Sequence, residues 1–296
     1  RGTNYADTYS AVGFGSGANV GNNGTFNEFE GMGGNDTITG NNNTRILYTN
    51  ATGAVTVDFA AGTASGNGSV GTDTLTGISQ VRGSTFGDTL LGSNTTAFTE
   101  VFDGNAGNDL IDGRGGFDQA VYNSNFLTTS GVSIDMATGT VTGDTTIGTD
   151  TLRSIEQITG TNFADTYDAS NYGAVGFTDP GTNNVGNVGT FNSFQGAGGN
   201  DTIIGNGNTQ IAFFGASGAV TVDLAAGTAS GNGSVGNDII VGGVNNVQGS
   251  NFGDTLTGNV GQPDTLSGGS GGDTYVVKHA ERGGDDGGDG VDVVEA

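Results

Sequence analysis

Residues 55–89 read VTVDFAAGTASGNGSVGTDTLTGISQVRGSTFGDT, and this stretch decides the fold because the chain carries it three times. The second copy, residues 132–166, reads VSIDMATGTVTGDTTIGTDTLRSIEQITGTNFADT and aligns without a gap. The third copy, residues 220–255, reads VTVDLAAGTASGNGSVGNDIIVGGVNNVQGSNFGDT and contains one inserted residue. A larger near-duplication relates residues 2–92 to residues 160–258. Tandem copies indicate a repeat architecture, so we expect residues 1–296 to form one continuous array.

The pattern within each copy predicts short strands. VTVDF and DTLTG alternate apolar and polar residues, as strands with one buried face do. Gly, Asn and Asp close each run, and these residues tolerate the backbone angles of tight turns. Gly makes up 60 of the 296 residues, which argues against helices because Gly is costly inside them. Many short strands in tandem copies predict an all-β fold, namely a right-handed parallel β-solenoid of the β-roll or β-helix type.

The charge balance excludes some partners and favours others. Asp and Glu number 31 against 7 Lys and Arg, which gives a net charge of −24. Such a field repels nucleic acids and anionic membranes, and the apolar runs are too short for a membrane span. We therefore expect no nucleic-acid partner and no membrane insertion. The chain has no Cys, which is compatible with export.

A nine-residue motif carries the candidate chemistry. It begins with Gly, has Gly again at its fourth position and Asp at its sixth. The copies are GMGGNDTIT at Gly31, GNAGNDLID at Gly104, GRGGFDQAV at Gly113, GAGGNDTII at Gly196 and GGSGGDTYV at Gly268. Variants with Phe at the fourth position begin at Gly83, Gly160 and Gly249. The motif resembles the RTX, or hemolysin-type calcium-binding, repeat GGxGxDxUx. The longer copies resemble the spacer regions of large bacterial surface proteins of that kind.

The resemblance implies calcium (Ca²⁺) at the motif aspartates. Calcium takes 6 to 8 oxygen ligands, and one turn supplies only part of such a shell, so neighbouring turns must cooperate. Two clusters have spacings near one coil, and they comprise Asp88, Asp109 and Asp118, and Asp254, Asp264 and Asp273. For these clusters calcium ligation is favoured over plain Asx-type turns.

Two further candidate ligands, Asp36 and Asp201, stand in motifs that look isolated. Arg45 and Gln210 occupy the positions nine residues later, where a paired motif would have Asp. For these two a turn role is favoured over calcium ligation. The copied Asp58, Asp135 and Asp223 fall within strands, where turn bonding or exposure to solvent is favoured. The acidic end, residues 283–292, admits equally a weak calcium site or a flexible tail.

Repeated aromatic residues admit two interpretations. Phe26 and Phe29 recur at residues 191 and 194, while Phe86, Phe163 and Phe252 share one repeat position. They could form a stripe that stacks on carbohydrate, but an internal stack of rings is favoured. Catalysis finds little support, since His279 is the single histidine and no zinc helix or nucleophilic triad is visible.

These patterns predict a non-catalytic, calcium-binding structural protein that is secreted by a bacterium or displayed on its surface. It would be an adhesin segment, a surface-layer protein or a fibre subunit that stacks head-to-tail into filaments. Its partners would be further copies of itself, bound end to end, other surface or matrix components, or glycans. The alternatives are a calcium-binding accessory module of a secreted enzyme or toxin, and a β-helix enzyme that acts on polysaccharides.

Overall fold

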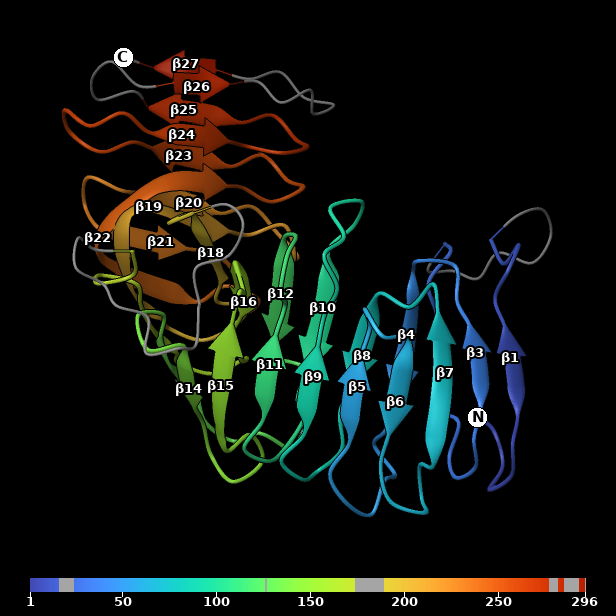
Figure 1. The fold of residues 1–296 in the computed structure, drawn as a ribbon. Helices are drawn as coiled ribbons and strands as arrows, with labels where there is room; N and C mark the ends of the chain where they lie inside the picture. Colours follow the sequence, from blue (N-terminus) through green and yellow to red (C-terminus); the bar gives the residue numbers. More distant parts are fainter. Residues whose placement is uncertain (16–23, 126, 174–188, 277–281, 285–292, 296) are drawn as a thin grey trace. The chain divides into compact units, whose positions relative to one another are not determined.

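The computed structural model describes residues 1–15, 24–125, 127–173, 189–276, 282–284 and 293–295. His279 and the acidic residues of the 283–292 stretch lie outside these ranges. The described residues form 27 strands and no helix, and the strands join into a large, mostly parallel sheet (Figure 1). The predicted all-β class is therefore confirmed. The described residues accordingly contain no helix of the length and apolarity that crossing a membrane requires.

The chain divides into two compact units. Unit 1 takes in Arg1–Leu127 and Thr145–Ile155, and unit 2 takes in Thr128–Asp144, Glu156–Gly181 and Val188–Ala296. The strands of unit 1 are β1 (Thr8–Ser10), β2 (Asn27–Phe29), β3 (Thr37–Thr39), β4 (Thr44–Leu47), β5 (Thr56–Asp58), β6 (Thr63–Ser65), β7 (Thr72–Thr76), β8 (Gln80–Arg82), β9 (Thr89–Leu91), β10 (Glu100–Asp103), β11 (Leu110–Asp112), β12 (Asp118–Val121) and β15 (Thr149–Arg153). The strands of unit 2 are β13 (Ser133–Asp135), β14 (Thr140–Thr142), β16 (Gln157–Thr159), β17 (Thr166–Asp168), β18 (Asn192–Gln195), β19 (Thr202–Ala212), β20 (Thr221–Asp223), β21 (Thr228–Ser230), β22 (Asn237–Gln248), β23 (Thr255–Thr257), β24 (Thr265–Ser267), β25 (Thr274–Val276), β26 (Arg282–Gly284) and β27 (Val293–Glu295).

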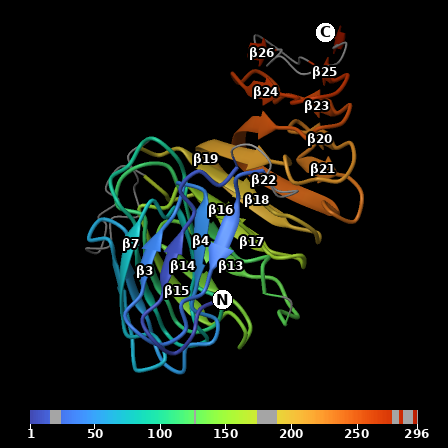
Figure 2. The ribbon, with the colours of Figure 1, turned by 90° about the vertical axis from the view of Figure 1, so that its right-hand side faces the viewer.

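The strands of each unit pair into two ladders. In unit 1 the first ladder runs β1–β3–β7–β6–β5–β9–β11–β15, and the second runs β2–β4–β8–β10–β12. In unit 2 the first ladder runs β14–β13–β17–β19–β22–β21–β20–β23–β25–β27. The second ladder of unit 2 runs β16–β18–β19–β22–β24–β26. Figures 1 and 2 show β23 beside β25, for example.

The copied stretches insert a hairpin into the first ladder. Strand β6 lies antiparallel between β5 and β7, and β21 lies antiparallel between β20 and β22. From β3 to β9 the first ladder takes four steps, through β7, β6 and β5, while the second ladder goes from β4 to β10 in two. The hairpin therefore lengthens one ladder without lengthening the other.

Parallel register stacks similar side chains into rows that form the core. Val57 pairs with Leu90, Leu90 with Ile111, and Ile111 with Leu152, and all four side chains are fully buried. Their neighbours in the short strands are less buried, because side chains alternate between the faces of a strand. A chain poor in large apolar residues can thus fill a narrow interior, since each strand contributes only one or two of them.

Truncation of this row should be costly. Leu90→Ala removes a fully buried side chain between two aliphatic neighbours, so we expect the free energy of unfolding to fall by about 2–5 kcal/mol. Val241→Ala, in β22 at an exposed position, serves as the control and should change it by only about 0.5 kcal/mol. Chemical denaturation followed by circular dichroism measures both. Equal losses from the two variants would contradict the assigned core.

Candidate functional site

The described aspartates that the motifs single out are buried. Eleven Asp side chains are at most 2 % exposed, and they are Asp36, Asp73, Asp88, Asp109, Asp118, Asp150, Asp165, Asp201, Asp254, Asp264 and Asp273. All eight candidate metal ligands are among them. Burying so many carboxyl groups is expensive unless each finds hydrogen-bond donors or loses its charge. Their partners therefore decide what this part of the molecule can do.

Most of these aspartates link one turn to the next. The backbone N–H of Asp88 donates to Asp109 Oδ1 at 2.7 Å, and the N–H of Asp109 donates to Asp150 Oδ1 at 2.9 Å. Asp88 and Asp109 directly precede β9 and β11, and Asp150 is the second residue of β15, so these bonds extend the ladder into the turn. The same bond recurs from Asp7 to Asp36, Asp36 to Asp73, Asp165 to Asp201, Asp201 to Asp238, and Asp254 to Asp273. We call this series the aspartate ladder.

One kind of turn, which we call turn A, also satisfies the second carboxylate oxygen. In the sequence GSTFGD, the Ser84 N–H donates to Asp88 Oδ2 at 2.6 Å, and the Ser84 hydroxyl donates to Oδ1 at 2.8 Å. Thr161 bonds Asp165 and Ser250 bonds Asp254 in the same way. Turn A also occurs at the sequence GTNYAD, which ends in Asp7. In turn A the carboxylate closes its own turn, as an Asx-type turn does.

A second kind, turn B, lacks the Ser or Thr that bonds that oxygen in turn A. Its second residue takes a positive φ, as at Asn105 (φ 70°) in GNAGND. The buried Oδ2 atoms of Asp36, Asp109 and Asp201 have no hydrogen-bond partner among the described residues. A Cβ on Gly104 would overlap Asp109 Oδ2, so only Gly fits the first position of this turn.

The two kinds of turn come in pairs. A turn A is followed along the aspartate ladder by a turn B in all four described cases: Asp7 with Asp36, Asp88 with Asp109, Asp165 with Asp201, and Asp254 with Asp273. The linked residues are 29, 21, 36 and 19 positions apart in sequence. The fourth residue of turn B must be Gly, because a Cβ on Gly107 would lie 2.6 Å from the backbone carbonyl group of Phe86.

Burial raises the pKa of these carboxyl groups. It raises the pKa of Asp109 to about 9, and the neighbouring charges of Asp150 and Asp88 add to the effect. Burial likewise raises the pKa of Asp201 to about 8. Burial also raises the pKa of Asp165 in a turn A, but hydrogen bonds from Val132 and Thr161 oppose the shift, and this pKa reaches only about 6. Turn B therefore holds its carboxyl oxygen ready for a proton or a cation.

The predicted clusters are assembled only in part. Asp88 lies next to Asp109, and Asp254 next to Asp273, as the spacing near one coil suggested. Asp118 begins β12 and Asp264 directly precedes β24, both in the second ladders, so neither joins the aspartate ladder. Asp264 instead binds the Asn259 N–H at 2.6 Å and the Asn259 side-chain amide at 2.7 Å.

Asp36 and Asp201 are not isolated, contrary to the expectation from spacing. Asp36 lies between Asp7 and Asp73 on the aspartate ladder, and Asp201 lies between Asp165 and Asp238 in the same way. Their downstream partners, Asp73 and Asp238, do not lie nine residues away. The inserted hairpin places each of them 37 positions further along the chain.

Five members of the aspartate ladder were not among the ligands predicted from the sequence, and they are Asp7, Asp73, Asp150, Asp165 and Asp238. A signal was present for three of them. Asp73, Asp150 and Asp238 occupy one position of the three copied stretches, in VGTDTL, IGTDTL and VGNDII. The strand copies Asp58, Asp135 and Asp223 accept backbone N–H groups two or three residues later, so they close surface turns as expected.

The predicted internal stack of rings is found at Phe29 and Phe194, whereas Phe26 and Phe191 are only half-buried. Phe29 stacks on Tyr9 at 4.5 Å between ring centroids, and Phe194 stacks on Tyr167 at 4.7 Å, with both Phe rings buried. Phe86, Phe163 and Phe252, however, are 44 %, 41 % and 44 % exposed. Their position in turn A lies outside the strand, where the side chain points away from the core.

The described residues have a restricted set of side chains that could bind a metal ion. They contain neither His nor Cys, and no cluster of three or more acidic side chains among them is arranged to enclose a metal ion. Any cation at the paired turns would therefore take one carboxylate oxygen from a turn and complete its shell with backbone carbonyls and water.

The raised pKa values predict a pH dependence in the presence of a chelator. An Asp in the unfolded chain has a pKa of about 3.9. Above that pH, the aspartates with raised pKa values hold more protons in the folded chain than in the unfolded chain. The free energy of unfolding must then fall as pH rises. Ordinary surface carboxyl groups finish titrating by about pH 6. The pKa of Asp201 is about 8 and that of Asp109 is about 9.

We therefore expect the melting temperature to decline between about pH 6 and pH 9, as measured by differential scanning calorimetry with chelator. Asp109→Asn keeps the Oδ1 acceptor and cannot ionise, so its decline should be shallower. A melting temperature of the wild-type chain that stays level over this interval would contradict protonated carboxyl groups in turn B.

Comparison with known proteins adds no relative to this description. No model of a known protein family matches the chain, and no curated protein matches it either. A functional conclusion must therefore come from the residues and the geometry of the paired turns.

Proposed function

We propose that this chain is a non-catalytic structural protein of the bacterial surface or extracellular matrix, stabilised by calcium bound at its paired turns. The observation that carries the proposal is the buried, unpartnered Oδ2 atom of turn B in Asp36, Asp109 and Asp201. A carboxylate in that position needs a positive partner, and an oxygen-rich turn suits a hard cation such as calcium.

The proposed architecture is a right-handed parallel β-solenoid of the RTX-like kind. Parallel pairing of strands that are far apart in sequence supports it, as in the run β5–β9–β11–β15. The aspartate ladder supports it as well, because it joins consecutive turns at a constant register. In a solenoid each coil contacts only its neighbours, so stability is close to a sum of local terms.

Calcium would lie at the paired turns, as at Asp88 with Asp109 and at Asp254 with Asp273. A Cβ on Gly83 would collide with both Asp88 Oδ2 and the Gly104 carbonyl oxygen, and Gly249 stands in the same relation to Asp254 and Gly268. Carboxylate and main-chain oxygens from both turns thus converge where glycine leaves room. A bound cation would supply positive charge there and offset the repulsion between neighbouring carboxylates.

A role outside the cell and without catalysis agrees with the remaining observations. The net charge of −24 and the absence of Cys suit a secreted chain that meets calcium outside the cell. The described residues contribute turns, short strands and buried carboxyl groups, which are the components of a scaffold. The chain would serve as a segment of an adhesin, a surface layer or a fibre.

Calcium should stabilise the folded chain. A ligand that binds only the folded state adds about 2.7 kcal/mol at a concentration 100 times its dissociation constant. We expect the melting temperature at neutral pH to rise when millimolar calcium replaces chelator. The double variant Asp109→Asn with Asp201→Asn should lose much of this rise, because an Asn side chain cannot give up a proton to bind the cation as a carboxylate.

Asp223→Asn is the matched control, because Asp223 closes a surface turn away from the aspartate ladder. This variant should keep the full response to calcium. Equal melting temperatures with calcium and with chelator in the wild-type chain would overturn the calcium claim. The calcium-independent fold would then rest on protonated carboxyl groups.

A further inference from the structure

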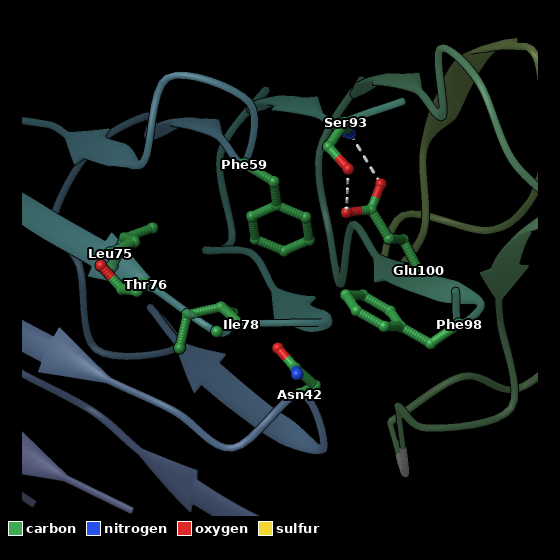
Figure 3. Close-up of a pocket in the computed structure, with 9 residues that line it drawn as sticks. Asn42, Phe59, Leu75, Thr76, Ile78, Ser93, Phe98 and Glu100 are labelled. Carbon is green, nitrogen blue, oxygen red and sulfur yellow. Dashed lines mark hydrogen bonds between the residues drawn. The ribbon is translucent and has the colours of Figure 1, made fainter. Parts of the chain in front are cut away.

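A cavity of about 160 Å³ lies in unit 1, where the inserted hairpin meets the second ladder. It is lined by Asn42, Phe59, Leu75, Thr76, Gly77, Ile78, Ser93, Phe98 and Glu100. Figure 3 shows the rings of Phe59 and Phe98 and the amide of Asn42 around one space, with Ile78 at its side. Asn42 is exposed, so the cavity is accessible from solvent.

A second cavity, of about 350 Å³, lies at the corresponding place in unit 2. It is lined by Gly207, Gly243, Val244, Asn245, Asn259, Gln262 and Pro263. Gly207 stands 165 positions after Asn42, and Val244 and Asn259 stand 166 positions after Ile78 and Ser93. The backbone matches too, since φ is positive at both Asn42 (62°) and Gly207 (86°). These three lining positions thus correspond in the two cavities.

The hollow follows from the hairpin insert. Strands β5 and β6 enter the first ladder between β7 and β9, and the second ladder has no such insert. The turns that leave β7 and β9 are therefore separated, and the turn after β9 is long. Glu100 braces this long turn by accepting the Ser93 N–H at 2.6 Å and the Ser93 hydroxyl at 2.8 Å.

Asp264 and Asn259 form the same brace beside the second cavity, at 2.6 and 2.7 Å. Glu100 and Asp264 are both at most 2 % exposed. Each cavity is thus framed by a buried carboxylate that fixes its wall, rather than by a loose surface loop. A recurring hollow with a fixed wall is typical of a largely preformed ligand site.

The lining indicates which ligand would fit. Amide and hydroxyl groups both donate and accept hydrogen bonds, and Asn42, Thr76 and Ser93 provide them in the first cavity. In the second cavity Asn245, Asn259 and Gln262 do so. Phe59 and Phe98 add flat apolar faces, while no basic side chain lines either cavity. The net charge of −24 further disfavours anionic ligands.

We propose that these two cavities bind neutral saccharide units, whose hydroxyl groups meet the amides and whose apolar ring faces meet the aromatic or apolar wall. The smaller cavity would hold one sugar ring, and the larger would admit a second. This binding is independent of the calcium proposal, because none of the lining residues belongs to the aspartate ladder. The fixed walls imply that the sites exist before the ligand arrives.

Titration with maltose, cellobiose and lactose, followed by amide NMR in saturating calcium, tests the proposal. We expect at least one of these probes to shift signals of both cavities at concentrations up to about 10 mM, a range suited to weak binding. Glucuronic acid should shift neither set. Absence of a response to all three neutral probes would overturn the proposal.

Variants separate the two sites. Phe98→Ala with Asn42→Gly should weaken binding at the first cavity by about 10-fold or more, and Asn42→Gly keeps the positive φ that Gly207 adopts in the other copy. Asn245→Ala with Gln262→Ala should weaken the second cavity alone. The matched controls Phe86→Ala and Phe252→Ala remove exposed rings outside both cavities.

The control variants should bind as the wild-type chain does. Loss of binding in the control variants, with the cavity variants unaffected, would place the sugar on the exposed turn A rings and would overturn the assignment. Thermal melts of every variant confirm folding, and a melt without calcium separates failure of this inference from failure of the calcium proposal.

Discussion

The hydrogen bond from the backbone N–H of one aspartate to the carboxylate of the next holds the turns of this molecule in register. It extends the parallel ladders beyond the ends of strands that are mostly short, as at the three-residue strands β9 and β11. Strands so short bury few apolar side chains, and polar links between turns must supply order that a larger core would give. The carboxylates therefore lie inside, where their burial also makes them respond to protons and cations.

The two kinds of turn have different roles. Turn A uses a Ser or Thr to satisfy its own carboxylate and places an aromatic ring at the surface, as with Ser84 and Phe86. Turn B gives up that donor and takes glycines instead, which allows the backbone of turn A to approach closely. Because Asp109 loses a donor, burial raises its pKa to about 9, further than the pKa of about 6 at Asp165 in a turn A. In each pair, turn A is held closed by its own hydrogen bonds, and turn B is the turn whose carboxyl group responds to protons and cations.

Much of the fold could be predicted from the sequence, because alternation in VTVDF and repeated Gly-Asp turns specify strands and turns locally. The buried positions of Asp88 and Asp109 follow from the same repeats. The partners of Asp36 and Asp201 could not be predicted from local spacing, since a hairpin inserted between coils changes the separation in sequence without changing contact in space. The exposure of Phe86 was also missed. A turn residue lies outside the alternation that assigns side chains to the interior.

The links of the aspartate ladder span from 19 to 41 residues of intervening chain, yet each has the same bond at 2.7 to 3.0 Å. Contact along the stack is thus uncoupled from the length of the segment that leads to it. A lineage that carries such a chain can lengthen a connecting segment, or duplicate a stretch, without disturbing the turns on either side. Residues of the connecting segments, such as Phe98 and Gln262, line the two cavities, so the architecture allows surface features to vary while the scaffold stays constant.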